Sequence, residues 1–220
     1  MAKTTDQCRD EIITIGRKLV AARLISATGG NLSIRTDDGI LVTATGTDLC
    51  QLTPQDVVLV DPQTGQPQPD QKRPTCELST YLACYQAIAS LKAILHCHPI
   101  WTIGVVSGHG SIPPMFPEFV DDVESIGYVD YVLPTTQEMA DAVAASLKVH
   151  GACIIRNHGV FARGANLNQA FNRAVLIEES AKAFAIASMT GTPTCLTDEQ
   201  ADEVLNLEGS KYRKQLAEQE

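Results

Sequence analysis

A series of short apolar segments, alternating with longer segments of helical periodicity, constrains the fold of this chain more than any other feature. Residues 32–35 and 40–43 have strand character and flank Asp37-Asp38-Gly39, a turn sequence typical of a β-hairpin. Strand character recurs in five further segments: residues 57–60, 93–97, 128–133, 152–155 and 160–162. With hairpin signals concentrated in its first third, the chain is predicted to have an α/β fold in which helices flank a mostly antiparallel central sheet.

The segments between the strands carry apolar residues at helical spacing. The first predicted helix spans residues 6–22 with Asp6 as its N-cap, and the capping-box pattern Thr197-Asp198-Glu199-Gln200 begins the last one. Residues 100–107 fit either a helix or a buried strand, and residues 112–119, with three prolines, are predicted to form a loop. Further helices are predicted at residues 77–90, 136–149 and 167–189.

Length and composition set the expected class of the protein. A chain of 220 residues with 44% hydrophobic and 20% charged residues is typical of one globular domain. We therefore expect a single domain over residues 1–220, with a mobile tail at 210–220. The sequence has no bilayer-spanning apolar run and a polar start, which predicts a cytoplasmic protein without a membrane partner. A net charge of −9 without a basic stripe argues against nucleic-acid binding.

Three of the histidines are placed where they could share one metal ion. His96 and His98 lie two residues apart on a predicted strand, so both imidazoles point to one face, and Cys97 points to the other. His158 follows another apolar strand, where Gly159 permits a sharp turn. Catalytic zinc commonly has three protein ligands and an open fourth position. Taken singly, these histidines also fit ordinary polar residues at strand ends and turns.

Backbone N–H groups for an anion are predicted in three places. Thr28-Gly29-Gly30-Asn31 lies between a helix and a strand, and Thr45-Gly46-Thr47 ends the next strand. Each fits either a turn with a left-handed glycine or a nest of N–H groups that binds an anion. Thr75 and Cys76 precede a predicted helix, whose first N–H groups favour a phosphate. Glu77 begins that helix, where an acid complements the helix dipole.

In order and spacing, these motifs resemble the class II aldolase/adducin-head family over about residues 6–190. The segments that carry the resemblance are residues 27–33, 42–47, 74–77, 93–99, 157–164 and 170–182. The resemblance implies a three-layer α/β fold and a homotetramer with active sites between neighbouring subunits. It also implies a zinc ion, or another divalent transition metal, bound by His96, His98 and His158, with Glu77 as the catalytic acid or base.

The resemblance further implies a site for a small phosphorylated sugar. Its phosphate-binding positions correspond to Gly30, Asn31, Thr45, Gly46, Thr75 and Cys76. Tyr131 matches a tyrosine that donates a proton from the neighbouring subunit, and Tyr212 is a candidate for a mobile C-terminal tyrosine. Two features depart from the family. Cys76 is a poorer hydrogen-bond donor than the family's serine, and the apolar segment 113–117 suggests a deoxy or thioether substrate.

We therefore expect a metal-dependent aldolase, a carbon–carbon lyase, that reversibly cleaves a ketose 1-phosphate similar to L-fuculose 1-phosphate. The products would be dihydroxyacetone phosphate and an aldehyde. A sugar-phosphate epimerase, a methylthioribulose-phosphate dehydratase and a decarboxylase are alternatives, because family members share the metal site and differ in the bond they break. Two non-enzymatic alternatives are an adducin-like interaction module, although adducin heads lack the metal histidines, and a metal-independent sugar-phosphate binder.

Overall fold

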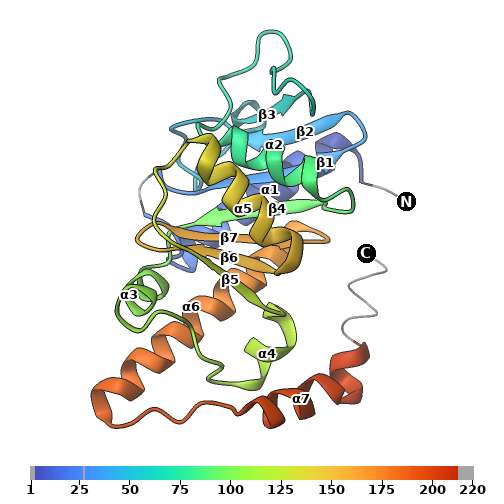
Figure 1. Cartoon of the computed structure of the whole chain (residues 1–220). Coiled ribbons are helices and arrows are strands. Elements are labelled where there is room, and N and C mark those ends of the chain that lie inside the picture. The colour runs from blue at the N-terminus through green and yellow to red at the C-terminus, as the bar shows by residue number, and fades with distance from the viewer. Residues whose placement is uncertain (1–2, 27, 213–220) are drawn as a thin grey trace.

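The computed structural model describes residues 3–26 and 28–212. Within these ranges, one sheet has the strand order β3-β2-β1-β4-β7-β6-β5 (Figure 1). Its strands are β1 (Asn31–Thr36), β2 (Gly39–Thr43), β3 (Val57–Val60), β4 (Ala93–Cys97), β5 (Ile126–Val129), β6 (Ala152–Ile155) and β7 (Gly159–Gly164). The β5–β6 pair is parallel, and every other neighbouring pair of this sheet is antiparallel. The predicted mostly antiparallel sheet is confirmed.

Helices cover both faces of the sheet and complete three layers (Figure 1). The described helices are α1 (Thr5–Ala21), the short η1 (Pro54–Asp56), α2 (Leu78–Ala87), α3 (Ile100–His109), α4 (Pro117–Val123), α5 (Gln137–Val149), α6 (Leu167–Thr190) and α7 (Asp198–Asn206). Alternate strand residues enter two apolar clusters, as the period of a strand requires. Leu95 and Cys97 pack with α1 and α6, whereas Ile94 packs with α2 and α5. His96, two residues from Ile94, therefore lies on the α2/α5 face.

Several predicted boundaries change in the structure. The N-cap of α1 is Thr4 and not Asp6, because the Thr4 hydroxyl accepts the N–H of Gln7 and the Gln7 side chain accepts the N–H of Thr4. The capping box at Thr197 is confirmed. Residues 100–109 form a helix. The predicted loop at 112–119 ends before Pro117, which begins α4. Proline is tolerated at the first position of a helix, because the N–H that it lacks would have no partner within the helix there.

The edge strand and the C-terminal region also differ from expectation. Strand β5 occupies Ile126–Val129 and not residues 128–133, so Tyr131 lies beyond its end. Residues 208–212 are helical and Ser210 is buried, while residues 213–220 of the predicted tail lie outside the described ranges, as does Ala27. No helix within residues 3–26 and 28–212 is both long and apolar enough to cross a membrane. The single domain over the whole chain and the cytoplasmic location stay predictions.

Candidate metal centre

The end of β4 delivers two of the three predicted metal ligands. His96 is the fourth residue of β4 and pairs with Asn31 of β1 on one side and with Phe161 of β7 on the other. His98 follows the strand, and its backbone N–H donates to the carbonyl of Leu24 at 2.9 Å. Because one residue separates them, the two imidazoles reach the same side of the sheet and their Nε2 atoms are 2.9 Å apart.

The third histidine comes from the turn between β6 and β7. The N–H of His158 donates to the carbonyl of Ile155 at 3.1 Å, which closes this turn. The turn lies against the end of β4, because a Cβ on Gly159 would stand 2.3 Å from the Cys97 carbonyl oxygen and 2.7 Å from His98 Cδ2. A residue with a side chain could not make this approach without moving the backbone. Glycine at position 159 therefore permits His158 to reach the other two histidines.

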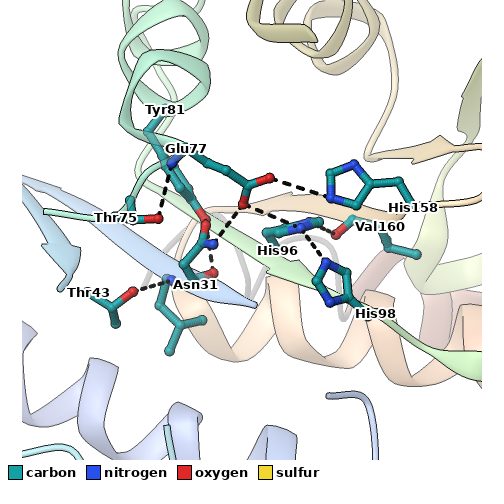
Figure 2. A network of polar contacts seen from close by, with 10 residues as sticks. Asn31, Thr43, Thr75, Glu77, Tyr81, His96, His98, His158 and Val160 are labelled. Atoms are coloured by element: carbon teal, nitrogen blue, oxygen red, sulfur yellow. Dashed lines mark hydrogen bonds and ion pairs between the residues drawn. The ribbon is translucent and has the colours of Figure 1, made fainter. Parts of the chain in front are cut away.

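The three imidazoles face one another and enclose a common space (Figure 2). One ligand atom from each of His96, His98 and His158 can be chosen so that all three lie within 4.8 Å of one another. A zinc ion with ligands at about 2.0–2.1 Å places tetrahedral nitrogens roughly 3.3 Å apart, so the observed spacings need small adjustments of the rings. The structure thus brings the three predicted ligands together in an arrangement that fits a divalent transition metal.

Burial prepares these rings for metal binding. His96 is fully buried, stacks on the Phe161 ring at 4.0 Å between centroids, and its Nδ1–H donates to the Val160 carbonyl at 3.0 Å. That bond leaves the Nε2 lone pair directed at the other histidines. Burial, together with the neighbouring imidazoles, lowers the pKa of His96 well below its usual value and lowers the pKa of His158 to about 4. Burial also lowers the pKa of His98. The neutral rings keep their lone pairs available.

The carboxylate of Glu77 lies beside the histidines. Its Oε2 is 3.5 Å from His96 Nε2, and its Oε1 is 3.5 Å from His158 Nε2. Glu77 is 5% exposed and is the N-cap residue of α2, yet its side chain makes no capping hydrogen bond. The Glu77 side chain therefore gives its own helix no capping hydrogen bond and lies instead beside the imidazoles.

Two hydrogen-bonded side chains hold Glu77 in this orientation (Figure 2). Asn31 Nδ2 donates to Glu77 Oε2 at 2.7 Å. The Tyr81 hydroxyl donates to the side-chain oxygen of Asn31 and, at 2.9 Å, to its carbonyl. Burial first, and then Glu77, raises the pKa of Tyr81 well above its usual value, so this hydroxyl stays a donor. Tyr81 is not among the site residues predicted from the sequence, although its i, i+4 spacing from Glu77 places both on one face of α2.

The segments predicted to bind phosphate are neighbours in the structure. Thr75 N donates to Thr43 O and Thr45 N donates to Arg73 O, both at 3.0 Å, so the two turns lie side by side. The end of the segment Thr28-Gly29-Gly30-Asn31 lies beside them, because the next residue, Leu32, donates its N–H to Thr43 Oγ1 at 3.3 Å. Thr45 and Thr75 therefore use their own N–H groups within the fold. A phosphate at this place needs other donors, such as hydroxyl groups and adjacent N–H groups.

The remaining residues singled out in the sequence lie at the surface or elsewhere. Tyr131 and Tyr212 are 58% and 60% exposed, and no hydrogen bond or ring contact of the described chain joins them to the histidines. The apolar segment 113–117 packs against α6: Ser180 Oγ donates to the Pro113 carbonyl and accepts from Met115 N. The hydrogen bonds of this segment give no support for a role beside the three clustered histidines.

Comparisons with known proteins agree with this geometry. A family model described as Class II Aldolase and Adducin N-terminal domain matches residues 10–185. An L-fuculose phosphate aldolase of Methanococcus maripaludis is 30% identical over 172 residues, which are 78% of this chain and 93% of that protein. A 5-methylthioribulose-1-phosphate/5-deoxyribulose-1-phosphate aldolase of Escherichia coli is 30% identical over 161 residues, which are 73% of this chain and 75% of that protein.

A solved structure shares the whole arrangement of layers. YgbL from Klebsiella pneumoniae, whose name offers aldolase, epimerase and decarboxylase as candidate activities, superposes with a TM-score of 0.84 at 28% identity. The superposition covers 92% of this chain and 100% of that one. The three-layer α/β fold that the sequence resemblance implied is confirmed.

Proposed function

This chain belongs to the class II aldolase and adducin N-terminal domain family and is a carbon–carbon lyase of the aldolase class, and we propose that it cleaves a ketose 1-phosphate. The proposed substrate is similar to L-fuculose 1-phosphate, and the products are dihydroxyacetone phosphate and an aldehyde, in a reversible reaction. One observation carries the proposal: a buried, oriented carboxylate, Glu77, lies 3.5 Å from two of three clustered imidazoles.

His96, His98 and His158 are the proposed ligands of one zinc ion per subunit, or of another divalent transition metal that imidazole suits. A bound ion supplies a Lewis acid that stabilises negative charge developing on the substrate oxygen atoms. The three side chains supply neutral nitrogen donors and leave a coordination position open for substrate. Their small separation, together with the hydrogen bond that fixes the His96 ring, supports this assignment.

Glu77 is the proposed catalytic acid and base. In the condensation direction its carboxylate takes the proton from the carbon next to the ketone carbonyl, and in the cleavage direction it returns that proton to the same carbon. Asn31 holds Oε2 by a hydrogen bond, so the carboxylate keeps one orientation while Oε1 remains on the His158 side. Tyr81 fixes Asn31 in turn and acts as a positioning residue.

The proton for the aldehyde oxygen is assigned to Tyr131 of a neighbouring subunit in a homotetramer. The exposure of Tyr131 in the single chain is compatible with a role across a subunit interface. The proposed phosphate site uses the adjacent turns, whose residues are Gly30, Asn31, Thr45, Gly46, Thr75 and Cys76. Positive φ at Gly30 and Gly46 is typical of N–H nests that bind anions.

Other substrates and reactions of the family remain candidates that an assay can distinguish. A deoxy or thioether ketose 1-phosphate is the second candidate substrate, because the Escherichia coli relative is named for both. Epimerase, dehydratase and decarboxylase activities use the same metal site on other bonds. The clustered histidines beside Glu77 argue against a non-enzymatic adducin-like module, in which that carboxylate would have no function.

The test is a panel of ketose 1-phosphates and 5-phosphates with detection of dihydroxyacetone phosphate. We expect this product from a ketose 1-phosphate, and we expect its loss on chelation of the metal. The Glu77→Gln variant should lose about 100-fold or more in kcat while retaining its metal, because proton transfer of this kind contributes at least that factor. The exposed Glu179→Gln variant is the matched control and should keep full activity.

Each other outcome of the panel has a definite meaning. Full activity of Glu77→Gln would show that the assigned acid and base is wrong. Substrate conversion without dihydroxyacetone phosphate would replace the aldolase proposal with epimerase, dehydratase or decarboxylase chemistry. A folded protein that binds no divalent metal would favour the hypothesis of a non-enzymatic, adducin-like interaction module.

A further inference from the structure

Helix α3 connects the two parts of the chain that carry His98 and His158. It begins at Ile100, directly after His98 and Pro99, and its N-cap residue Pro99 makes no side-chain capping bond. Its last turn lies beside the β6–β7 turn, which carries His158. In Figure 1, α3 lies near one end of the sheet, where β4 ends and the turn from β6 to β7 is found. The two ends of α3 are held by two charged side chains from other elements.

The N-terminus of α3 is held by a buried carboxylate of α6. Glu178 Oε1 accepts the N–H of Trp101 at 3.0 Å, and Oε2 accepts the N–H and the hydroxyl of Thr102, both at 2.8 Å. These N–H groups have no partner within the helix, and an anion is favoured at this end of the helix dipole. Because His98 lies two residues before Ile100, Glu178 fixes the segment that follows His98.

The C-terminal part of α3 is held by the residues directly before His158. Arg156 donates from Nη1 to the Val106 carbonyl at 3.0 Å and from Nη2 to the Gly110 carbonyl at 3.2 Å. Asn157 Nδ2 donates to Ser107 Oγ at 3.2 Å, and Asn157 has a φ of +58°, a left-handed conformation that costs about 1 kcal/mol or more. The contacts with α3 help to hold this turn in that conformation.

The His158 ring depends on this turn more than His96 depends on its surroundings. His96 is oriented by its own hydrogen bond to Val160, whereas His158 Nδ1 is buried without a hydrogen-bond partner in the described part of the chain. Besides its contact with Glu77 at 3.5 Å, the His158 ring therefore depends on the backbone of residues 156–158 for its position. Metal ligands whose orientation is not fixed lose affinity, typically by 10- to 100-fold.

We propose that α3 sets the spacing between His98 and His158, with Arg156 as the positioning residue at one end and Glu178 at the other. In the described part of the chain, neither side chain hydrogen-bonds to any of the three imidazoles. Each holds a segment that carries a ligand, and both segments are joined through one rigid helix. The proposal rests on the proposed metal site and extends it to two charged residues that lie outside the cluster of imidazoles.

The test compares Arg156→Gln with a chemically matched control. Arg35 also caps a helix of ten residues, because it donates from Nη1 to the Ala89 carbonyl at 2.6 Å and from Nη2 to the Tyr85 carbonyl at the end of α2. Arg35 and Arg156 are both partly exposed. The carbonyls that Arg35 binds lie at the far end of α2 from Glu77. Loss of Arg35 should therefore reduce stability without moving a metal ligand.

Co²⁺ titration of the full-length metal-free protein, followed through the visible absorption bands of the ion, measures affinity and geometry together. We expect the dissociation constant of Arg156→Gln to rise about 10- to 100-fold, with altered band positions. Arg35→Gln should stay within about twofold of the parent in affinity and keep its spectrum, although its Tm falls. Glu178→Gln is the second variant and should resemble Arg156→Gln in affinity and spectrum.

Two results would overturn the inference, and they are distinguishable. If the parent protein binds no Co²⁺, the proposed metal site itself is wrong. If the parent binds Co²⁺ and both Arg156→Gln and Glu178→Gln keep the parent affinity and spectrum while Tm falls as in Arg35→Gln, these residues serve stability alone. A loss of affinity confined to Arg156→Gln and Glu178→Gln supports the positioning role.

Discussion

Removal of one hydroxyl group tests how the carboxylate of Glu77 is held. Tyr81→Phe keeps the buried ring and deletes the donor to the side-chain and backbone oxygens of Asn31. A buried acceptor left without its donor costs about 1–3 kcal/mol of stability. For a chain of this size that corresponds to roughly 2–4 °C in Tm for each kcal/mol.

The effect on catalysis follows from the same contacts. Without Tyr81 the Asn31 amide can rotate, and Glu77 Oε2 loses its fixed donor at 2.7 Å. If about 1–1.4 kcal/mol of orientation is lost in the transition state, kcat falls about 5- to 10-fold. Metal content should change little, since the Tyr81 hydroxyl bonds Asn31 and none of the three histidines. The assay is steady-state formation of dihydroxyacetone phosphate, with the metal content of each preparation determined in parallel.

Tyr85→Phe is the matched control for this experiment. Tyr85 lies one turn farther along α2 and is also buried, and its hydroxyl donates a long hydrogen bond of 3.4 Å to the Lys92 carbonyl and none to Asn31 or Glu77 in the described part of the chain. We expect kcat of Tyr85→Phe to equal that of the parent. An unchanged kcat in Tyr81→Phe, or an equal decrease in both variants, would refute the argument that Tyr81 acts through Asn31 on Glu77.

Two further predictions follow. Gly159→Ala should destabilise the protein by about 1–3 kcal/mol and weaken Co²⁺ binding, because its Cβ would stand 2.3 Å from the Cys97 carbonyl oxygen. The control Gly104→Ala, whose Cβ would have nothing within 4 Å, should neither destabilise the protein nor weaken Co²⁺ binding. Parent-like Co²⁺ affinity in Gly159→Ala would contradict the role of Gly159 in bringing His158 to the other histidines. The hydrogen bond from Lys72, followed by that from Thr53, lowers the pKa of Asp56 to about 2, so Asp56 should contribute stability that is complete above about pH 4 and lost as the pH falls toward 2. Denaturant unfolding at several pH values should show a smaller acid-induced loss for Asp56→Asn, and an unchanged pH dependence would exclude this role.

Local sequence patterns were sufficient to predict much of the sheet and part of the site. Alternation along a strand places His96 and His98 on one face and Cys97 on the other, because this period is a property of the strand itself. The hairpin of β1 and β2 and the capping box at Thr197 likewise depend on residues near in sequence. The N-cap of α1 was predicted wrongly because Thr4 and Asp6 are both good caps, and the reciprocal bonds of Gln7 decide between them.

From the sequence came the candidate residues of the site: three histidines at strand ends, and a carboxylate at a helix start that the family resemblance singled out. Tertiary structure alone decided where Glu77 points, which tyrosine orients it and which helix joins His98 to His158. The physical reason is the range of the interactions. Strand and helix periods act over a few residues, whereas the β4–β7 pairing and the contacts of Arg156 and Glu178 join positions about 50 to 80 residues apart.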